Sequence, residues 1–216
     1  LSAFEQEAAD AIERAQKSEA LPELTDIEAH WKKKINPAPE QPPSVWEPLE
    51  ILSMNTSSGA TLTPQPDGSI LVGGINPPKD TYTLVLKSIL GPVTALRLEL
   101  LPDPSFHNNG PGRAGHGNVA LSKISLFAAS DSAPLQPVPI VNPTALYEQL
   151  GTSIAHTLDN DPNSHWAMMQ DLGKRNVAVL PAAAPVGGAD GVRFNIVLDF
   201  QTGFERHALG RFRFST

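Results

Sequence analysis

Beyond residue 45, apolar and polar residues alternate along much of the chain, and this period of two predicts β-strands. The clearest runs are residues 94–100 and 192–200, in which every second side chain is apolar. Shorter runs predict further strands at residues 49–54, 69–72, 81–87, 119–128, 177–180 and 209–214. Clusters of Pro, Gly, Asn and Asp separate the runs, with no helical pattern between them. Many short strands without intervening helices predict a mainly β protein, a sandwich or barrel.

The last run, residues 209–214, alternates strictly between two arginines and two phenylalanines. Because successive side chains of a strand point to opposite faces, Phe212 and Phe214 are predicted to face the core, and Arg211 and Arg213 to face outward. The arginines are then either paired with acids of neighbouring strands, Glu99 or Asp199, or part of a ligand-binding face. Both interpretations stay open, and both arginines are kept as candidate ligand-binding residues.

The apolar phase changes within residues 119–128. The larger apolar residues have odd numbers before Ser122 and even numbers after it. An extra residue accommodated near Ser122 would restore the alternation, so we predict a β-bulge there.

The first 45 residues follow a different pattern. An apolar residue recurs every three or four positions in residues 4–15, which is typical of one helix face, and Thr25 and Glu28 have the capping spacing of a second short helix. Four prolines between residues 37 and 43 predict an extended linker. The chain is therefore predicted to contain a helical arm (1–36), a Pro-rich linker (37–44) and a β-sandwich domain (45–216).

Composition limits the function. The chain has 216 residues, of which 40% are hydrophobic and 18% charged, enough apolar material for a sizeable core. A net charge of -7 argues against a nucleic-acid partner, which a basic surface would attract. The absence of cysteine excludes disulfides and cysteine-ligated zinc. No apolar run approaches the roughly 18 residues of a spanning helix, so we expect no membrane insertion of this segment.

A glycine-rich loop at residues 108–118 is the first candidate ligand site. Its glycines would let a backbone approach a ligand, and Arg113 offers a forked donor to a carboxylate or to sugar hydroxyls. His116 and Asn118 complete its candidate ligand-binding residues. The competing interpretation is a long connecting loop that the arginine merely orders.

A second polar loop, residues 158–166, carries Asp159 and Asp161. Closely spaced carboxylate and amide oxygens suit calcium, so these two aspartates are the candidate ligands of a structural calcium ion. Asx turns explain the same composition without a metal, and the spacing of an EF-hand is absent. Trp166 is either a platform on which a sugar stacks or an anchor in the core.

Catalytic motifs are missing. The sequence has no Gly-x-Ser-x-Gly, no His-Glu-x-x-His and no Gly-x-Gly-x-x-Gly motif, and its 6 histidines are scattered. We therefore expect a protein that is not an enzyme.

Several short motifs in a fixed order resemble a module of large planctomycete-type cytochrome-c-like proteins of unknown function. Its first half is carried by Asp67-Gly-Ser-Ile-Leu, Asn76-Pro, Asp80-Thr-Tyr-Thr, Thr94-Ala-Leu-Arg-Leu-Glu, Asp103-Pro-Ser, Gly110-Pro-Gly-Arg-Ala and Gly117-Asn-Val-Ala-Leu-Ser. Its second half is carried by Leu158-Asp-Asn-Asp, His165-Trp-Ala and Leu209-Gly-Arg-Phe-Arg-Phe-Ser. This resemblance implies a periplasmic or other extracytoplasmic setting and a chain excised from a longer protein.

The loop around Asp159 and Trp166 is also similar to one in galactose-binding-like, or discoidin-like, jelly rolls, many of which bind carbohydrate and hold a structural calcium near that loop. We therefore expect a jelly-roll-like β-sandwich that serves as a non-catalytic accessory module and binds a glycan. The alternative is an interaction module that packs against other domains of the parent protein and binds no small ligand. An exposed apolar patch in place of a polar cleft would favour this alternative.

Overall fold

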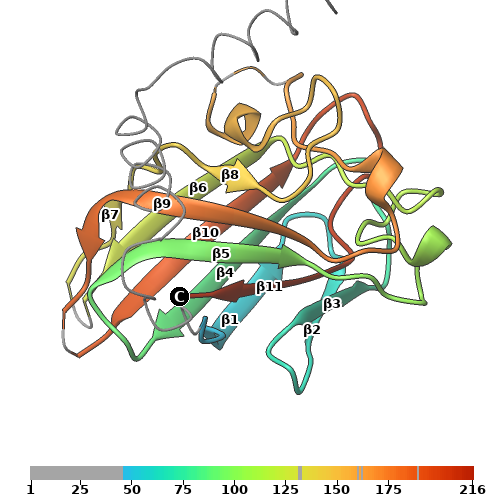
Figure 1. Cartoon of the computed structure of the whole chain (residues 1–216). Helices are drawn as coiled ribbons and strands as arrows, with labels where there is room; N and C mark the ends of the chain where they lie inside the picture. Colours follow the sequence, from blue (N-terminus) through green and yellow to red (C-terminus); the bar gives the residue numbers. More distant parts are fainter. Residues whose placement is uncertain (1–45, 131–132, 160, 162, 189) are drawn as a thin grey trace, which may run out of the picture. The chain divides into compact units, whose positions relative to one another are not determined.

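The computed structural model describes residues 46–130, 133–159, 161, 163–188 and 190–216. The helical arm and the Pro-rich linker predicted for residues 1–44 lie outside the described residues. Two antiparallel sheets make up the described domain (Figure 1). One sheet has five strands, in the order β1 (Glu50–Thr56), β4 (Asp80–Ser88), β10 (Val192–Phe200), β6 (Lys123–Ala129) and β7 (Gln136–Pro137). The other has six, in the order β2 (Thr61–Pro64), β3 (Ile70–Gly73), β11 (Arg211–Ser215), β5 (Val93–Leu100), β9 (Asn176–Val186) and β8 (Thr144–Ala145).

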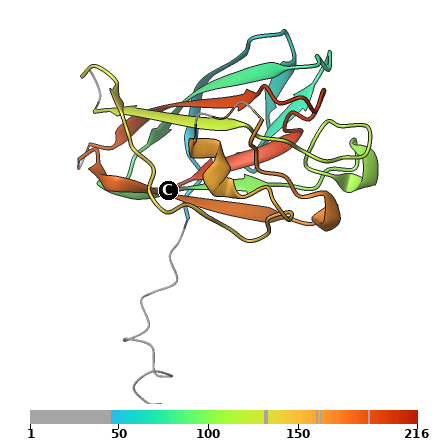
Figure 2. The ribbon, with the colours of Figure 1, turned by 90° about the horizontal axis from the view of Figure 1, so that it is seen from above.

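The prediction of a mainly β protein is confirmed, and the two sheets share one apolar core. Seen from above, β9 (orange) and β6 (yellow-green) lie on opposite sides of the domain (Figure 2). Alternate residues of β4, β5, β10 and β11 are buried between the sheets, as their period of two requires. Three short 3₁₀ helices lie in the connections: His107–Asn109, Ile154–Leu158 and Met169–Asp171. None of the described helices is long and apolar enough to cross a membrane.

The closing strand β11 behaves as its alternation predicts. Phe212 and Phe214 are 0% and 2% exposed and pack in the core. Tyr82 of β4 lies across from them, with 6.1 Å between its ring centroid and that of Phe212, and its hydroxyl donates a hydrogen bond to the carbonyl of Leu209. Burial raises the pKa of the Tyr82 hydroxyl. The last strand therefore links the two sheets through aromatic side chains.

The change of apolar phase at Ser122 has a different cause from the predicted bulge. Strand β6 begins at Lys123 and pairs with β10 in one continuous register, so the bulge prediction is wrong. The residues before it pair elsewhere, because Leu121 exchanges backbone hydrogen bonds with Trp166. Ser122 bridges to the end of β10 by donating its hydroxyl to the carbonyl of Asp199. Two runs with different partners, rather than one strand with an extra residue, produce the switch.

Candidate functional site

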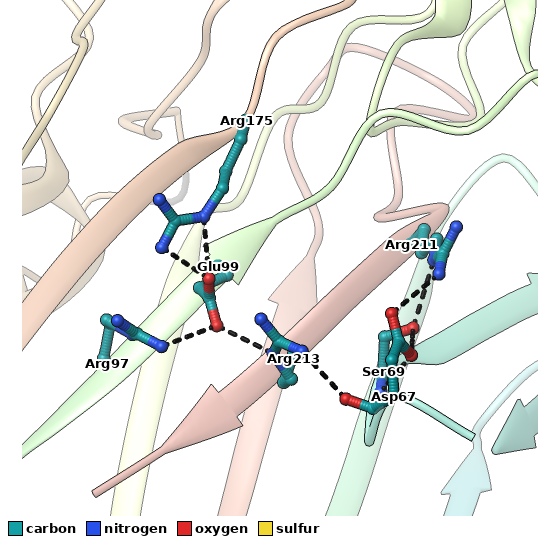
Figure 3. Close-up of polar contacts among 7 residues, drawn as sticks. All are labelled: Asp67, Ser69, Arg97, Glu99, Arg175, Arg211 and Arg213. Atoms are coloured by element: carbon teal, nitrogen blue, oxygen red, sulfur yellow. Dashed lines mark hydrogen bonds and ion pairs between the residues drawn. The ribbon is translucent and has the colours of Figure 1, made fainter. Parts of the chain in front are cut away.

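The outward face of β11 contacts acids of its own sheet (Figure 3). The carboxylate of Glu99, on β5, is fully buried beneath three guanidinium groups. It accepts hydrogen bonds from Arg213 Nε at 2.8 Å, Arg97 Nη2 at 3.0 Å and Arg175 Nε at 2.7 Å. Burial raises the pKa of Glu99, but hydrogen bonds from Arg213 and Arg175 and the charge of Arg97 outweigh it and lower the pKa. Glu99 is thus held as a carboxylate.

Arg211 is held in the same way at the neighbouring position. Its Nη2 lies 2.9 Å from Asp67 Oδ2, its Nη1 lies 3.2 Å from Asp103 Oδ2, and its Nε donates to the hydroxyl of Ser69. Arg213 also donates to the backbone carbonyl of Asp67. We call this cluster the arginine face; it consists of Asp67, Ser69, Arg97, Glu99, Asp103, Arg175, Arg211 and Arg213. The interpretation of Arg211 and Arg213 as salt-bridged residues is confirmed: Arg211 pairs with Asp67 and Asp103, and Arg213 pairs with Glu99.

Arg113 orders its loop rather than opening toward a ligand. It is only 9% exposed, and its Nη2 donates to the carbonyls of Gly73 and Gly74, at 3.2 and 3.0 Å. The side-chain amide of Asn76 donates in turn to the carbonyl of Arg113 at 2.8 Å. The loop of residues 108–118 is therefore fastened to the end of β3.

Glycine is required in this loop because the loop folds back on itself. A Cβ on Gly110 would collide with the carbonyl oxygen of Gly117, and a Cβ on Gly117 would collide with that of His107. Gly117 also has a φ of +89°, which non-glycine residues rarely adopt. The glycines thus serve internal packing, and the loop presents His116 on the turn that precedes Gly117.

Trp166 is a core anchor. Its side chain is 0% exposed, and its indole N–H donates to the carbonyl of Tyr147 at 3.1 Å. The hydrogen bonds between its backbone and Leu121 fix the loop before β6 against the segment around residue 166. No face of the indole is open for a sugar to stack on.

Asp159 and Asp161 form consecutive Asx turns. The backbone N–H of Asp161 donates to Asp159 Oδ1 at 2.9 Å, and that of Asn163 donates to Asp161 Oδ1 at 2.9 Å. Ser164 adds a hydroxyl donor to Asp159 at 2.7 Å, and these hydrogen bonds hold the pKa of Asp159 below its usual value. Internal hydrogen bonds account for the composition of the loop. Across the described part of the chain, no group of three or more His, Asp or Glu side chains is placed to hold a metal ion.

Two of the predicted ligand residues, His116 and Asn118, meet in a small hollow of about 230 Å³. Four separate segments build it, and Ala120, Ala167 and Met169 supply its apolar lining. We call it the histidine hollow; its aromatic and polar lining residues are His116, Asn118, Gln149, His165, Phe204 and His207.

The aromatic rings of the histidine hollow form a continuous row. The ring centroids of His116 and His207 are 5.0 Å apart, those of His207 and Phe204 5.6 Å, and those of Phe204 and His165 5.0 Å. Phe204 is 54% exposed, and within the part of the chain that the structure describes it is the only exposed Phe, Tyr or Trp side chain. An apolar ring therefore stands open to solvent among three imidazoles.

The loop after β10 positions Phe204 and His207 through its backbone. The N–H of Phe204 donates to the hydroxyl of buried Thr202, which fixes the turn. Arg206 has a φ of 62°, and among the described residues it is the only one other than Gly and Asn with a positive φ. Its N–H donates to the carbonyl of Pro78. Strained backbone of this kind clusters at functional sites.

Hydrogen bonds indicate which tautomer each imidazole adopts when it is neutral. His116 Nδ1 accepts from the backbone N–H of Asn118, so the neutral ring carries its proton on Nε2. His165 Nδ1 lies 3.1 Å from the carbonyl of Asn163, and His207 Nδ1 lies 2.7 Å from that of Glu205. A carbonyl only accepts, so both rings carry their proton on Nδ1 and keep a lone pair on Nε2. The hollow thus offers one imidazole donor and two imidazole acceptors.

Two amides add further donors. The side-chain oxygen of Asn118 accepts from the backbone N–H of Met168, and that of Gln149 accepts from Met169, each at 3.1 Å. No acceptor among the described residues is assigned to their NH₂ groups, which can therefore bind a ligand. Burial, and a charge on His207 when that ring is protonated, lower the pKa of His116. The hollow can therefore donate to and accept from hydroxyl groups.

Comparisons of the chain with protein-family models, with curated proteins and with solved structures give no significant match.

Gln149, Phe204 and His207 were missed as site residues, and His165 was considered only as part of its loop. One signal was available for Phe204, because a lone aromatic residue stands in the polar loop Gln-Thr-Gly-Phe-Glu-Arg-His at residues 201–207. Nothing in the sequence indicates that four distant segments meet.

A second depression differs in character. It is an apolar groove of about 700 Å³ between the ends of β6 and β9 and the segment that contains β7. Its lining consists of Ala, Pro, Val and Gly residues with Ser130 and Gln136, and no charged side chain is among the described residues that line it.

Proposed function

We propose that the domain is a non-catalytic carbohydrate-binding module and that the histidine hollow is its sugar site. The observation that carries this proposal is the exposed Phe204, flanked by His165 and His207. An aromatic face buries the apolar C–H face of a sugar ring, and nearby polar groups fix its orientation.

The polar groups of the hollow match sugar hydroxyls. A hydroxyl both donates and accepts, and the hollow offers the lone pairs of His165 and His207 together with donors from His116 and two amides. Its volume of about 230 Å³ is below the roughly 300–1,000 Å³ of sites for drug-sized ligands, so we expect one sugar unit to be held, with weak affinity.

The setting of the module is also a proposal. We assign the two sheets to the jelly-roll-like, galactose-binding-like type and place the domain in a larger extracytoplasmic protein, on the resemblance of the motifs between residues 67 and 215. Loops at the end of a rigid two-sheet scaffold are a common position for binding residues, which supports the location of the site.

Isothermal titration with a broad panel of soluble oligosaccharides tests the proposal. The wild-type domain is expected to bind at least one sugar, and Phe204→Ala is expected to abolish that binding while the melting temperature stays unchanged. Ile89→Ala is the matched control, because Ile89 is 73% exposed and lies outside the hollow. Absence of binding across the panel at millimolar sugar, or full binding by Phe204→Ala, would overturn the proposal.

The alternative function, an interaction module, is favoured by the apolar groove. Small apolar side chains such as Ala183 and Ala184 offer a surface on which another domain of the parent protein can pack. A charge placed there, Ala184→Asp, is expected to weaken that association in the parent protein and leave sugar binding intact. If Ala184→Asp weakens the association and the wild-type domain binds no sugar, the interaction module is favoured over the sugar-binding proposal.

A further inference from the structure

The histidine hollow has an unusual balance of ionisable groups. It is lined by three imidazoles, and among the described residues that line it there is no Asp, Glu, Lys or Arg. The nearest charged neighbours along the chain are Glu205 and Arg206, in the loop of His207. Asp159 and Asp161 precede His165, and their carboxylates accept hydrogen bonds within their own loop. The charge of the hollow itself therefore depends on its imidazoles, which titrate near neutral pH.

Protonation affects the imidazoles differently. His207 already donates through Nδ1 to the carbonyl of Glu205, so a second proton enters at Nε2 and turns an acceptor into a charged donor. His116 accepts at Nδ1 from the N–H of Asn118, so its protonation would break that hydrogen bond and place a charge beside His207. A proton taken up by this pair therefore enters at His207 Nε2, where it breaks no hydrogen bond.

The rings of His116 and His207 are neighbours and lie edge to face, at an interplanar angle of 65°. The ring centroids of His116 and His207 are 5.0 Å apart, and each ring carries a proton on Nε2 once His207 is protonated. Two adjacent donors, one of them charged, suit the two oxygens of a carboxylate. Phe204, whose centroid is 5.6 Å from that of His207, provides the adjoining apolar face.

We propose that the ligand is an acidic sugar whose carboxylate is bound by the His116–His207 pair while its ring stacks on Phe204, and that proton uptake by His207 turns this binding on. The inference rests on the proposed sugar site and names its ligand class and its regulation. His165, on the other side of Phe204, contacts the hydroxyl groups of the sugar.

The test uses a trimer of galacturonic acid and the neutral trimer of galactose, titrated into the domain at about pH 5.5 and about pH 8, on either side of the usual imidazole pKa of about 6.5. The uronate is ionised at both values, so a change in its affinity reports on the protein. We expect the acidic trimer to bind about tenfold more tightly at the lower pH, and the neutral trimer to change less than about twofold. In His207→Gln, which keeps a polar side chain but cannot take the charge, the ratio of the acidic trimer's affinities at the two pH values is expected to fall to about one, even though both trimers bind more weakly.

The outcomes separate the two proposals. Binding of neutral sugars with no pH-dependent gain for the uronate overturns the inference and leaves the sugar site standing. Failure of both trimers and of every other sugar in the panel overturns the sugar site as well. A gain that survives in His207→Gln overturns the assignment to His207, and His116→Gln serves as a second variant in case the first does not fold.

Discussion

The arginine face and the histidine hollow use polar side chains in opposite ways. On the arginine face, acids accept from every arginine around them, and Glu99 is fully buried beneath three of these cations. In the hollow, imidazole and amide groups keep donors and lone pairs that no described residue uses, beside an exposed Phe204. A surface whose charges satisfy one another is built for stability, whereas a concave surface with unused polar groups beside an aromatic ring is built to bind.

The largest expected effect is a loss of stability at low pH, caused by protonation of the acids on the arginine face. Burial raises the pKa values of Glu99, Asp67 and Asp103, but hydrogen bonds and arginine charges lower them more, so all three lie below their ordinary values. A carboxyl group whose pKa is lower in the folded state than in the unfolded state stabilises the fold. This stabilisation is complete above the unfolded-state pKa, which is 4.5 for Glu99 and 3.8 for the aspartates, and it is lost as the pH falls through the folded-state pKa. The melting temperature is therefore expected to fall steeply below about pH 4.5. A melting temperature that is constant from about pH 6 to about pH 3 would show that these pairs do not stabilise the domain.

Glu99→Gln isolates the centre of that face. The change leaves Arg97, Arg175 and Arg213 without their shared anion, and we expect a loss of about 2 kcal/mol in the free energy of unfolding with no change in sugar binding. Asp171→Asn is the matched control, because its partner Lys174 is 71% exposed, so solvent screens the pair and the change should cost much less stability. Urea unfolding of both variants measures the difference, and equal stabilities would contradict the account.

Arg211→Gln should have a smaller effect. The side chain of Arg211 is 26% exposed, so solvent replaces part of what Asp67 and Asp103 provide, and we expect a loss of about 1 kcal/mol. Arg213→Gln should behave similarly, and neither variant should change ligand affinity. If either lost binding at an unchanged melting temperature, the arginine face rather than the hollow would be the ligand surface.

The smallest expected effect lies in the loop that carries Phe204 and His207. Arg206 has a φ of 62°, which glycine adopts more readily, so Arg206→Gly should raise the free energy of unfolding by about 0.5 kcal/mol. Greater freedom of the loop that carries Phe204 should at the same time weaken sugar binding. Thermal unfolding and titration of one sample measure both effects, and a loss of stability would show that this backbone is not strained.

The same comparison shows what the sequence could predict. Strict alternation identified β10 and β11 and the inward positions of Phe212 and Phe214, because a period of two directly encodes which face is buried. The short strands β2, β7 and β8 were missed. Pro64 interrupts the apolar alternation in β2, and Pro137 interrupts it in β7. Strand β8 has only 2 residues, which are too few to show a period.

The sites were predicted unevenly. Glu99 and Asp199 were both named as acids near the outward arginines. Glu99 does pair with Arg213, whereas Asp199 lies on β10 in the other sheet and accepts a hydrogen bond from Thr81. His116 and Asn118 were chosen from an unusual loop, whereas Gln149 and His207 gave no local signal. Their proximity depends on where four loops end in space, which neither periodicity nor spacing records.

Chemical-shift mapping of the isotope-labelled domain during titration with the tightest-binding oligosaccharide tests the central claim most directly. The account predicts shifts confined to the segments that line the histidine hollow, around residues 116–120, 149, 165–169 and 204–207, with none at Arg97, Arg211 or Arg213. Shifts centred on the arginine face, with the hollow unperturbed, would contradict it.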